Sequence, residues 1–311
     1  MQKINRFTRR QRGLVTRAQA LGAGFTDAEI AALLRRVILF EIRPGVYALA
    51  GAPPSWEQAV LAAVLAAGPG AYASHRTAAS LWSFRRFTQP EQIDLVATIE
   101  RKIGLDGVVG HRSRELFDAD LTTRRGIPAV TAARALIDVS GQLPPDELGR
   151  ALDDLLRRKL CTLDDVRRAI ARLHPGPGRS LRSMHHALAE RWPGYDPGES
   201  DLETRAVRAI AKAGLPLPRQ QFRMLLRGKP VRIDLAYPEL KIAIEVDSWE
   251  YHGMQRSAFD VDHIRRDDLV VLGWAPLTFT SAMTDPYFVG NVRALIDAAE
   301  LRFEIGRSGA A

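Results

Sequence analysis

Three carboxylates lie close together in an otherwise apolar stretch of the chain. The segment RIDLAYPELKIAIEVDSWEYHG, residues 232–253, contains Asp234, Glu245 and Asp247, and His252 lies close behind them. A carboxylate in such a strand-like run costs free energy unless a partner offsets its charge. Carboxylates that converge at the end of a strand repel one another unless a cation lies between them. These residues therefore predict either a metal site or acids paired with nearby arginines.

The period of a β-strand decides which of these side chains can meet. In residues 240–247 apolar and polar side chains alternate, so Glu245 and Asp247 project from the same face of one predicted strand. Asp234, on the preceding strand, can lie beside them if the register of the hairpin allows. Mg²⁺ and Mn²⁺ prefer oxygen ligands, and a metal-bound water can attack phosphate. We expect Asp234, Glu245 and Asp247 to hold one of these ions, unless local arginines pair with the acids instead.

The wider pattern resembles the PD-(D/E)XK nuclease superfamily. The matching acids are Glu203 on a first predicted helix, Asp234 after a turn, and Glu245 and Asp247 on the next strand. Within that superfamily the chain is similar to the very-short-patch-repair endonuclease-like group, in the stretches RIDLAYPELKIAIEVDSWEYH and FDVDHIRRDDLVVLGWAPLTFT. The resemblance covers residues 200–280 and implies a restriction-endonuclease-like core with the element order α-β-β-β-α-β.

The resemblance also implies roles for individual residues. Asp234 and Glu245 match metal-binding acids, and His252 matches a histidine used in proton transfer. Arg265 matches the arginine of a DxxR motif and is expected to contact the scissile phosphate. Glu203 is expected to bind a water that is coordinated to the metal, without contacting the metal itself.

One position departs from the superfamily pattern. That pattern has a lysine two residues after the second acid, where it orients the attacking water or stabilises charge on the phosphate. This chain has Asp247 there. Lys241 shares the strand face but lies four residues before Glu245, roughly 13 Å along a strand, too far to reach the same phosphate. Either His252 or Arg265 takes over this role, or the site is weak or inactive.

The N-terminal segment carries most of the net positive charge. The formal net charge is +8, and residues 1–50 contain nine Lys or Arg against three Asp or Glu, which gives +6. A compact basic module indicates a polyanionic partner, most simply double-stranded DNA, although a solvated charged face is the alternative. The residues expected to contact DNA are Arg9, Arg10, Arg12, Arg17, Arg35, Arg36 and Arg43.

The local patterns of this segment predict a helix, a turn, a second helix and a hairpin. Thr16 caps a helix that ends at glycine, and Thr26 with Glu29 forms a capping box before the second helix. The stretch VILFEIRPGVYALAG predicts two strands around a turn at Pro44 and Gly45. This order is typical of a winged helix, in which the second helix enters the major groove and basic residues hold phosphates.

The same segment resembles the N-terminal winged-helix domain of AbiEi-type antitoxins from type IV toxin–antitoxin systems. GLVTRAQALGAG and RPGVYALAG carry this likeness over residues 1–51. AYASHRTAASLW, IDLVAT and RGIPAVTAARALIDVS extend it loosely over residues 55–172. The resemblance implies a cognate toxin as a second partner. We expect a winged-helix domain, an AbiEi-like middle domain, a linker with one short helix over residues 173–199 and a nuclease domain over residues 200–311.

The middle segment predicts a mixed α/β domain without a catalytic constellation. Helices are expected over residues 56–67, 74–83, 131–140 and 145–157, and strands near 93–97 and 107–112. His75 and His111 are isolated in the sequence, so we expect both to be structural residues. The adjacent His185 and His186 point in different directions on a helix and therefore do not form a metal pair.

Cysteine usage and hydropathy limit the class of protein. The single cysteine, Cys161, excludes an intramolecular disulfide and suits a reducing cytoplasm, and we expect it to pack in a core. No apolar run approaches the roughly 20 residues that span a membrane. We therefore expect a cytoplasmic α/β multidomain protein without a membrane partner.

Two functions from different classes fit this sequence. In the first, the chain is a Mg²⁺-dependent DNA endonuclease that finds duplex DNA with its winged helix and hydrolyses phosphodiester bonds with its C-terminal domain. In the second, it is a DNA-binding regulator of the antitoxin type whose nuclease-like domain has no turnover; the missing lysine favours this alternative. An RNA nuclease is less well supported, because a helix in the major groove suits B-form DNA.

Overall fold

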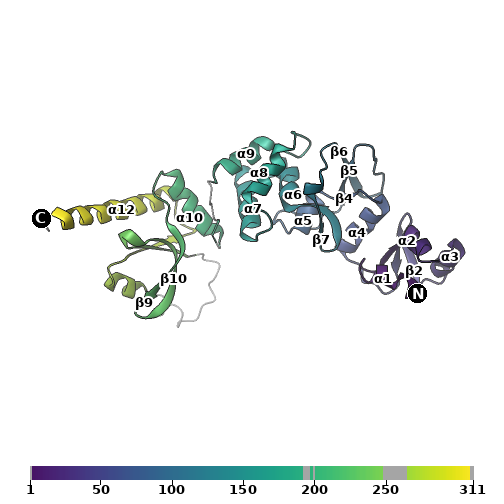
Figure 1. Cartoon of the computed structure of the whole chain (residues 1–311), viewed down its shortest axis with the longest axis horizontal. Coiled ribbons are helices and arrows are strands. Elements are labelled where there is room, and N and C mark those ends of the chain that lie inside the picture. The colour runs from purple at the N-terminus through teal and green to yellow at the C-terminus, as the bar shows by residue number, and fades with distance from the viewer. Residues whose placement is uncertain (1, 192–196, 199, 248–264, 309–311) are drawn as a thin grey trace. The chain divides into compact units, whose positions relative to one another are not determined.

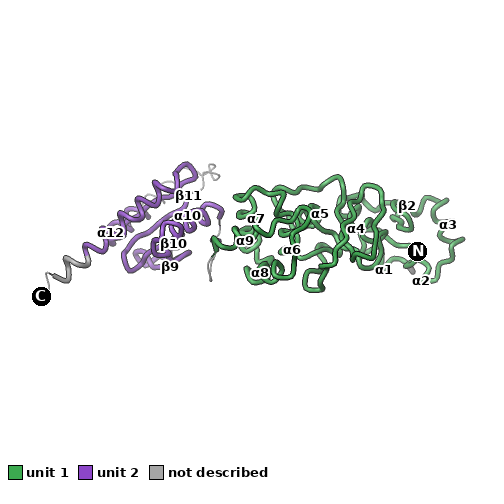
Figure 2. Tube along the Cα trace, turned by 90° about the horizontal axis from the view of Figure 1, so that it is seen from above, with its two compact units in different colours: residues 1–191 green, residues 192–311 purple. Residues whose placement is uncertain are grey.

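The chain forms two compact units, Met1–Arg191 and Trp192–Ala311 (Figure 2). Both combine helices with β-sheets, so the chain is an α/β multidomain protein. No helix in the described part of the chain is long and apolar enough to span a membrane. The structure is a computed structural model, and it describes residues 2–191, 197–198, 200–247 and 265–308.

Unit 1 begins with three helices and a small antiparallel sheet with the strand order β1-β3-β2. The elements are α1 Gln2–Thr8, β1 Leu14–Thr16, α2 Arg17–Gly22, α3 Asp27–Arg35, β2 Leu39–Arg43 and β3 Val46–Leu49 (Figure 1). Thr16 and Thr26 cap α2 and α3 through capping boxes with Gln19 and Glu29, which confirms the predicted starts of both helices. The hairpin of β2 and β3 is also confirmed, whereas α1 and β1 were not predicted.

A five-stranded sheet with the order β6-β5-β4-β8-β7 forms the centre of unit 1. Its strands are β4 Tyr72–Ala73, β5 Ile93–Thr98, β6 Val108–Ser113, β7 Leu121–Arg124 and β8 Ile127–Val130. The helices of this part are α4 Trp56–Ala67, α5 His75–Leu81, α6 Ala132–Val139, α7 Pro145–Arg157, α8 Leu163–Ala171 and α9 Leu181–Ala189. The four predicted helices correspond to α4 to α7 and the two predicted strands to β5 and β6. The strands β4, β7 and β8 and the helix α8 were not predicted.

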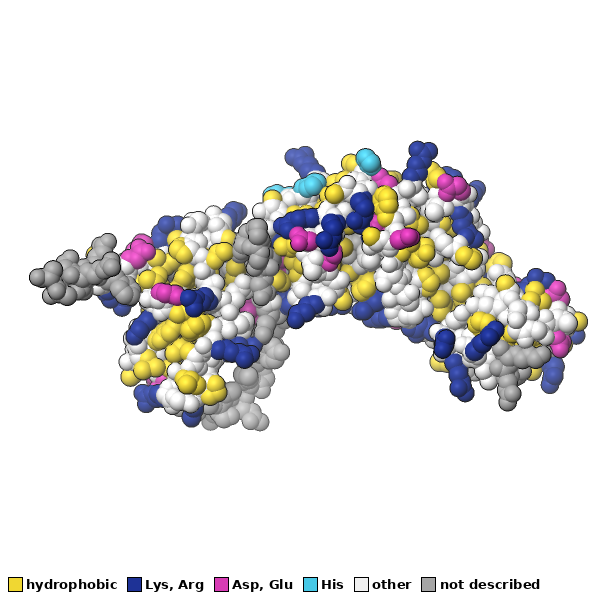
Figure 3. Space-filling model, in the orientation of Figure 1, with side chains coloured by type: hydrophobic (Ala, Val, Ile, Leu, Met, Phe, Trp, Pro, Cys, Tyr) yellow, Lys and Arg dark blue, Asp and Glu magenta, His cyan; other side chains and the backbone are white. Residues whose placement is uncertain are grey.

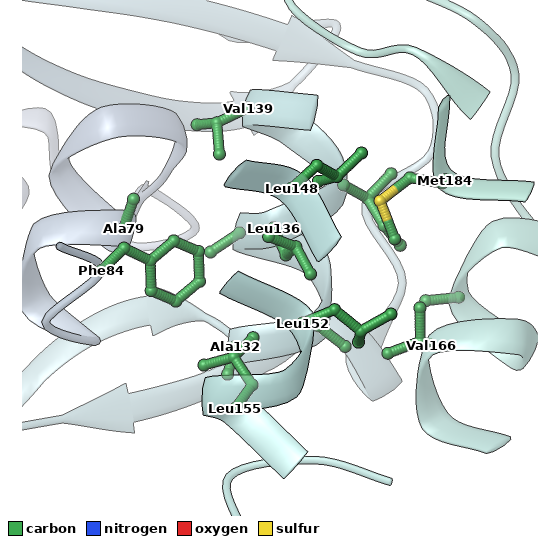
Figure 4. Close-up of a cluster of buried hydrophobic side chains, with 14 of the residues drawn as sticks. Ala79, Phe84, Ala132, Leu136, Val139, Leu148, Leu152, Leu155, Val166 and Met184 are labelled. Atoms are coloured by element: carbon green, nitrogen blue, oxygen red, sulfur yellow. The ribbon is translucent and has the colours of Figure 1, made fainter. Parts of the chain in front are cut away.

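Helix α6 lies at the centre of the largest core of unit 1. All eight of its residues are buried, and Leu136 packs among apolar side chains of α7 and the residues that follow α5 (Figure 4). Leu148 and Leu152 from α7, Val166 from α8 and Met184 from α9 are fully buried in the same cluster. This packing ties four helices to one face of the central sheet.

A second core joins the N-terminal elements to the middle of unit 1. Leu14 of β1 and Val46 of β3 pack in one cluster with Val60 of α4. The Gln58 side-chain amide, also on α4, donates to the Arg12 carbonyl at 2.7 Å. The two domains expected over residues 1–51 and 55–172 therefore pack together as one compact unit.

The segment expected to be a linker, residues 173–199, is divided between core and boundary. Helix α9 lies within it, and Met184 and Leu188 of α9 are buried in the core beside α7. Arg191 binds Asp153 of α7 at 2.6 Å. Unit 1 thus extends to residue 191, because the apolar face of α9 is buried instead of facing solvent.

Unit 2 contains a four-stranded sheet between helices. The elements are α10 Asp201–Lys212, β9 Arg219–Leu226, β10 Lys229–Tyr237, β11 Ile242–Asp247, a helix at 265–271, β12 Ala275–Thr280 and α12 Asp285–Ser308. The strand order is β12-β11-β10-β9, in which β11 and β12 are parallel and the other pairs are antiparallel. One face of the sheet packs on α10 and α12, and the other on the helix at 265–271.

Candidate active site and basic surface

Asp234 and Glu245 lie on neighbouring antiparallel strands of unit 2. Strands β10 and β11 pair with Leu235 opposite Ile244. Asp234 and Glu245 are the next residue on each strand, beyond this last pair. The register that the sequence left open therefore puts the two acids at the same level of neighbouring strands, one step beyond the last pair.

The regular pairing of β10 with β11 ends at this point. Beyond the Leu235–Ile244 pair, the Val246 amide donates to the Asp234 carboxylate, with 2.9 Å between N and Oδ2. The side chain takes the place that a backbone carbonyl holds in a regular ladder. The Asp234 carboxylate is thus held against the backbone that carries Glu245.

Glu245 forms an ion pair with Arg265, the first described residue of the helix at 265–271. Nη2 of Arg265 lies 2.6 Å from Oε1 of Glu245, and the same nitrogen donates to the Arg232 carbonyl. The two paired side chains are 29% and 30% exposed, so solvent reaches them. The alternative to a metal site, an acid paired with a local arginine, is therefore present at Glu245.

Glu203 reaches the sheet from the first turn of α10. It is only 6% exposed, and the Gln221 side-chain amide donates to it, with 2.7 Å between Nε2 and Oε2. Gln221 lies on β9 at the position that the register places opposite Asp234. Gln221 was not identified from the sequence, where the available signal was two consecutive glutamines inside a predicted strand.

Asp247 and His252 are not added to this group by the structure. Asp247 is exposed at the end of β11, and His252 lies outside the described residues. In the part of the chain that the structure describes, no three His, Cys, Asp or Glu residues are close enough to share a metal ion. Mg²⁺ in phosphate-handling sites uses one or two carboxylates together with waters and substrate oxygens. Asp234 and Glu245 fit that donor set as a pair, without the third expected ligand.

Lys241 is held away from the acids. The strand predicted over residues 240–247 begins at Ile242, because Lys241 adopts the left-handed conformation, with φ +54°, after a short turn. Its Nζ donates to the Leu272 carbonyl at 3.1 Å. This position agrees with the expectation that Lys241 does not replace the missing lysine.

Six of the seven arginines expected to contact DNA are exposed, and four of these six lie at or just past the end of a helix. Two of them follow α1, and two lie at the end of α3, where a helix would present them to an adjacent phosphate. These residues are Arg9, Arg10, Arg35 and Arg36.

The other three arginines have partners within unit 1. Arg17 pairs with Asp27 at 2.5 Å, and Arg43 donates to a backbone carbonyl between β5 and β6. Arg12 donates to the Arg125 carbonyl at 3.0 Å, in the turn between β7 and β8. Arg12 and Arg43 therefore hold the N-terminal elements against the central sheet.

Three further arginines, which were not identified from the sequence, converge on the end of α5. Arg125 lies 3.1 Å from the Ser83 hydroxyl, and Arg158 lies 3.0 Å from the Trp82 carbonyl. The Arg124 guanidinium lies over the Trp82 ring, 4.5 Å from its centroid. Burial, followed by the charges of Arg125 and Arg158, lowers the pKa of Arg124.

Figure 3 shows Lys and Arg side chains spread over the surface in view, with Asp and Glu between them.

His75 and His111, which are isolated in the sequence, are brought together by the fold. Their rings stack with centroids 3.7 Å apart. His111 Nε2 lies 2.9 Å from one oxygen of buried Asp94, and Arg76 binds the other oxygen at 2.9 Å. Burial opposes ionisation of Asp94, but the hydrogen bonds from His111 and Arg76 outweigh it and lower the Asp94 pKa. Burial lowers the pKa of His75 to about 4, so His75 is neutral near pH 7.

Cys161 packs against the main core of unit 1, in keeping with the expected packing role. Burial raises the pKa of its thiol to about 12. The thiolate is the nucleophilic form of cysteine, so this environment disfavours thiol catalysis near neutral pH.

Comparison with known proteins finds distant relatives. No family model matches the chain. Two Mycobacterium tuberculosis proteins, uncharacterized protein MT2308 and uncharacterized protein Rv2248, are each 27% identical over 223 residues, 70% of this chain and 78% of theirs. The crystal structure of the RV2827C protein from the same species covers 73% of this chain and 90% of its own, with a TM-score of 0.38 and 16% identity. At these levels of similarity we assign neither a family nor a function to the chain.

Proposed function

We propose that this chain is a metal-dependent DNA endonuclease. The observation that carries the proposal is that the regular pairing of β10 and β11 ends just before Asp234 and Glu245, where the Asp234 carboxylate binds the backbone of β11. Carboxylates from adjacent strands are suitable ligands for Mg²⁺ or Mn²⁺. Such an ion offsets charge on the phosphate and lowers the pKa of a bound water that acts as nucleophile. The same two acids match metal ligands in the resemblance to PD-(D/E)XK nucleases.

Arg265 and Glu203 are the neighbouring side chains proposed to assist. Nε of Arg265 is a buried atom without a hydrogen-bond partner among the described residues, although Nη2 of the same guanidinium binds Glu245. A buried donor of this kind suits a phosphate oxygen of the substrate. Glu203 accepts a hydrogen bond from Gln221, and its proposed role of holding a water of the ion rests on the resemblance. His252 keeps its proposed role in proton transfer on the sequence pattern alone.

We further propose that the N-terminal elements form a winged helix that binds duplex DNA. Their order is α1, β1, α2, α3, β2 and β3, and the apolar faces of α2 and α3 share one core. In this arrangement α3 enters the major groove, and Arg35 and Arg36 at its exposed end contact phosphates.

A plasmid-nicking assay with Mg²⁺ or Mn²⁺ tests the nuclease proposal. Asp234→Asn keeps an oxygen acceptor for the Val246 amide, and Glu245→Gln keeps one for Arg265, so both variants retain the local hydrogen bonds. We expect each change to lower cleavage about 100-fold or more, because a charged ligand is removed. Glu239→Gln, which removes a charge from an exposed ion pair of the same unit, is the matched control. Cleavage that persists in both D234N and E245Q would exclude this site.

A non-catalytic DNA-binding regulator of the antitoxin type is the second candidate. The observation that favours it is the ion pair of Glu245 with Arg265, since this guanidinium already offsets the charge of one proposed ligand. The presence of Asp247 at the position of the usual lysine also favours this second candidate. In this case the wild-type chain binds duplex DNA but nicks no plasmid with either ion, and a cognate toxin is the proposed protein partner.

A further inference from the structure

Gln221 has an unusual backbone conformation for a residue inside a β-strand. Its φ is +51°, in the left-handed region that residues other than glycine rarely adopt, while β9 continues on both sides of it. Strands β9 and β10 pair regularly before and after this residue. The pair that Gln221 would form with Asp234 is missing. The distortion therefore falls directly opposite a proposed metal ligand.

The side chain of Gln221 connects this distorted position to Glu203. Because a carboxylate can only accept, the contact of 2.7 Å to Glu203 Oε2 assigns the donor nitrogen of the amide. The other end of the amide, Oε1, is buried and has no hydrogen-bond partner within the described ranges. The orientation of the Gln221 side chain is thus set by the Glu203 carboxylate.

The Glu203 carboxylate is also confined on a second side. A Cβ atom placed on Gly198 would come within 2.9 Å of Glu203 Oε2, closer than atoms of this kind approach. Gly198 has a φ of +71°, which suits glycine. Gly198 therefore leaves room for the buried carboxylate that the amide of Gln221 binds.

A strained residue persists only where the surrounding contacts hold it. Glycine would adopt the same backbone at position 221 without strain, but it would lack the amide that binds Glu203. The strain is therefore retained together with a specific hydrogen bond to an acid of the proposed site.

We propose that Gln221 is a positioning residue of the metal site, an inference that rests on the proposed function. Its amide holds the Glu203 carboxylate where it can bind a water of the ion. Its distorted backbone interrupts pairing with β9 at Asp234, the residue whose carboxylate accepts a hydrogen bond from the Val246 amide on β11. Gln221 thus acts on two acids of the proposed site, Glu203 of α10 and Asp234 of β10.

The test measures Mn²⁺ binding to the full chain by isothermal titration calorimetry. The variants are Gln221→Gly, which accepts the left-handed backbone, Glu203→Gln, and the two changes combined. We expect each single variant to raise the Kd for Mn²⁺ about 10-fold, the effect typical of removing a residue that orients a ligand. The double variant should bind no more weakly than the weaker single variant, because both changes remove one interaction.

Two measurements separate positioning from general damage to the fold. Arg227→Gly, at another left-handed residue with φ +47° in the turn between β9 and β10, relieves strain in the same sheet and should leave Mn²⁺ binding unchanged. In the nicking assay, Q221G should lower kcat while the KM for DNA stays at the wild-type value. The thermal unfolding midpoint of Q221G should stay close to that of the wild type, because the relieved backbone strain offsets the lost hydrogen bond.

The possible outcomes distinguish the inference from the proposed function. Additive effects in the double variant would overturn the inference, because Gln221 would then act independently of Glu203. Unchanged Mn²⁺ binding in Q221G, with binding abolished in D234N, would overturn it while leaving the metal site in place. A wild-type chain that neither binds Mn²⁺ nor nicks DNA would reject the proposed function, and the role of Gln221 with it.

Discussion

The imidazole rings of His75 and His111 stack at a centroid distance of 3.7 Å, with their planes inclined by 15°. His75 is 8% exposed and opens α5, whereas His111 comes from β6 and binds Asp94. A proton on His75 would be buried and would face any charge on His111. The folded protein therefore resists protonation of His75, which links its stability to pH.

We predict that the protein loses stability as the pH falls from about 6.5 towards 4. His75 has a pKa of about 4 in the folded state, below the ordinary value of 6.5, so the unfolded state binds the proton over this range. Stability then rises with pH, is fully present above pH 6.5, and decreases by on the order of 3 kcal/mol by pH 4. Urea denaturation at a series of pH values from 7.5 to about 4.5 measures this change.

The matched variant for this experiment is His75→Asn. Asparagine does not titrate, and it tolerates the left-handed backbone of this position, where φ is +45°. H75N should be less stable than the wild type at pH 7.5 and should show a smaller decline towards pH 4.5. Acids such as Asp94 contribute equally to both proteins, so equal declines would rule out the effect assigned to His75.

The exposed arginines at the end of α3 yield a prediction about DNA binding. Replacing Arg35 and Arg36 together by Gln should lower the affinity for duplex DNA and flatten its salt dependence. The slope of log K against log salt should fall by roughly 0.9 for each phosphate that the variant no longer neutralises. Fluorescence anisotropy at several salt concentrations measures the slope. Arg167 and Arg168, an adjacent pair on α8, provide the control double variant, and a slope unchanged in R35Q/R36Q would contradict the role of α3.

The ion pair between Arg265 and Glu245 yields a prediction about metal affinity. If Arg265 competes with the ion for Glu245, then Arg265→Gln should bind Mn²⁺ about five-fold more tightly, since such a pair contributes ~1 kcal/mol. Cleavage should nevertheless fall, because the donor proposed to contact phosphate is removed. Arg266→Gln, at the exposed neighbouring position, is the control for calorimetry and nicking. Weaker Mn²⁺ binding in R265Q would show that the arginine supports the ion instead of opposing it.

The buried ion pair between α7 and Arg191 yields a prediction about stability. Arg191 is 2% exposed, and its guanidinium binds both oxygens of Asp153, at 2.7 and 2.6 Å. Arg191→Met removes the cation that offsets this buried carboxylate, and we expect unit 1 to lose about 3–5 kcal/mol. Arg86→Gln, in the exposed pair with Glu147, should cost no more than ~1 kcal/mol. Denaturant titration of both variants compares the two effects, and similar values would contradict the importance of burial.

Local signals in the sequence were sufficient for many elements of the fold. Helices α4 and α7 have the predicted bounds, because a serine cap and a glycine delimit the first and a proline opens the second. The capping boxes at Thr16 and Thr26 likewise depend on neighbours in the chain. Strand β4 gave no usable signal, since two residues are too few for an alternating pattern.

The contacts within the candidate site depended on long-range register, which local patterns do not contain. Alternation in the sequence placed Glu245 on a strand face, but only the pairing of β10 with β11 brought Asp234 to the same level of the neighbouring strand. The left-handed backbone of Gln221 and its bond to Glu203 join elements whose packing no periodicity reveals. The stack of His75 on His111 has the same origin.

The shared core of Leu14, Val46 and Val60 limits where this protein can be truncated or joined to a segment of another protein. A chain that started after residue 51 would present aliphatic surface of α4 to water, and a drop in its DNA affinity would be hard to tell from aggregation. Single surface substitutions avoid this ambiguity. For the same reason, a chimaera that borrows the first 50 residues from a relative would need the matching α4 as well, so the natural unit of exchange includes that helix.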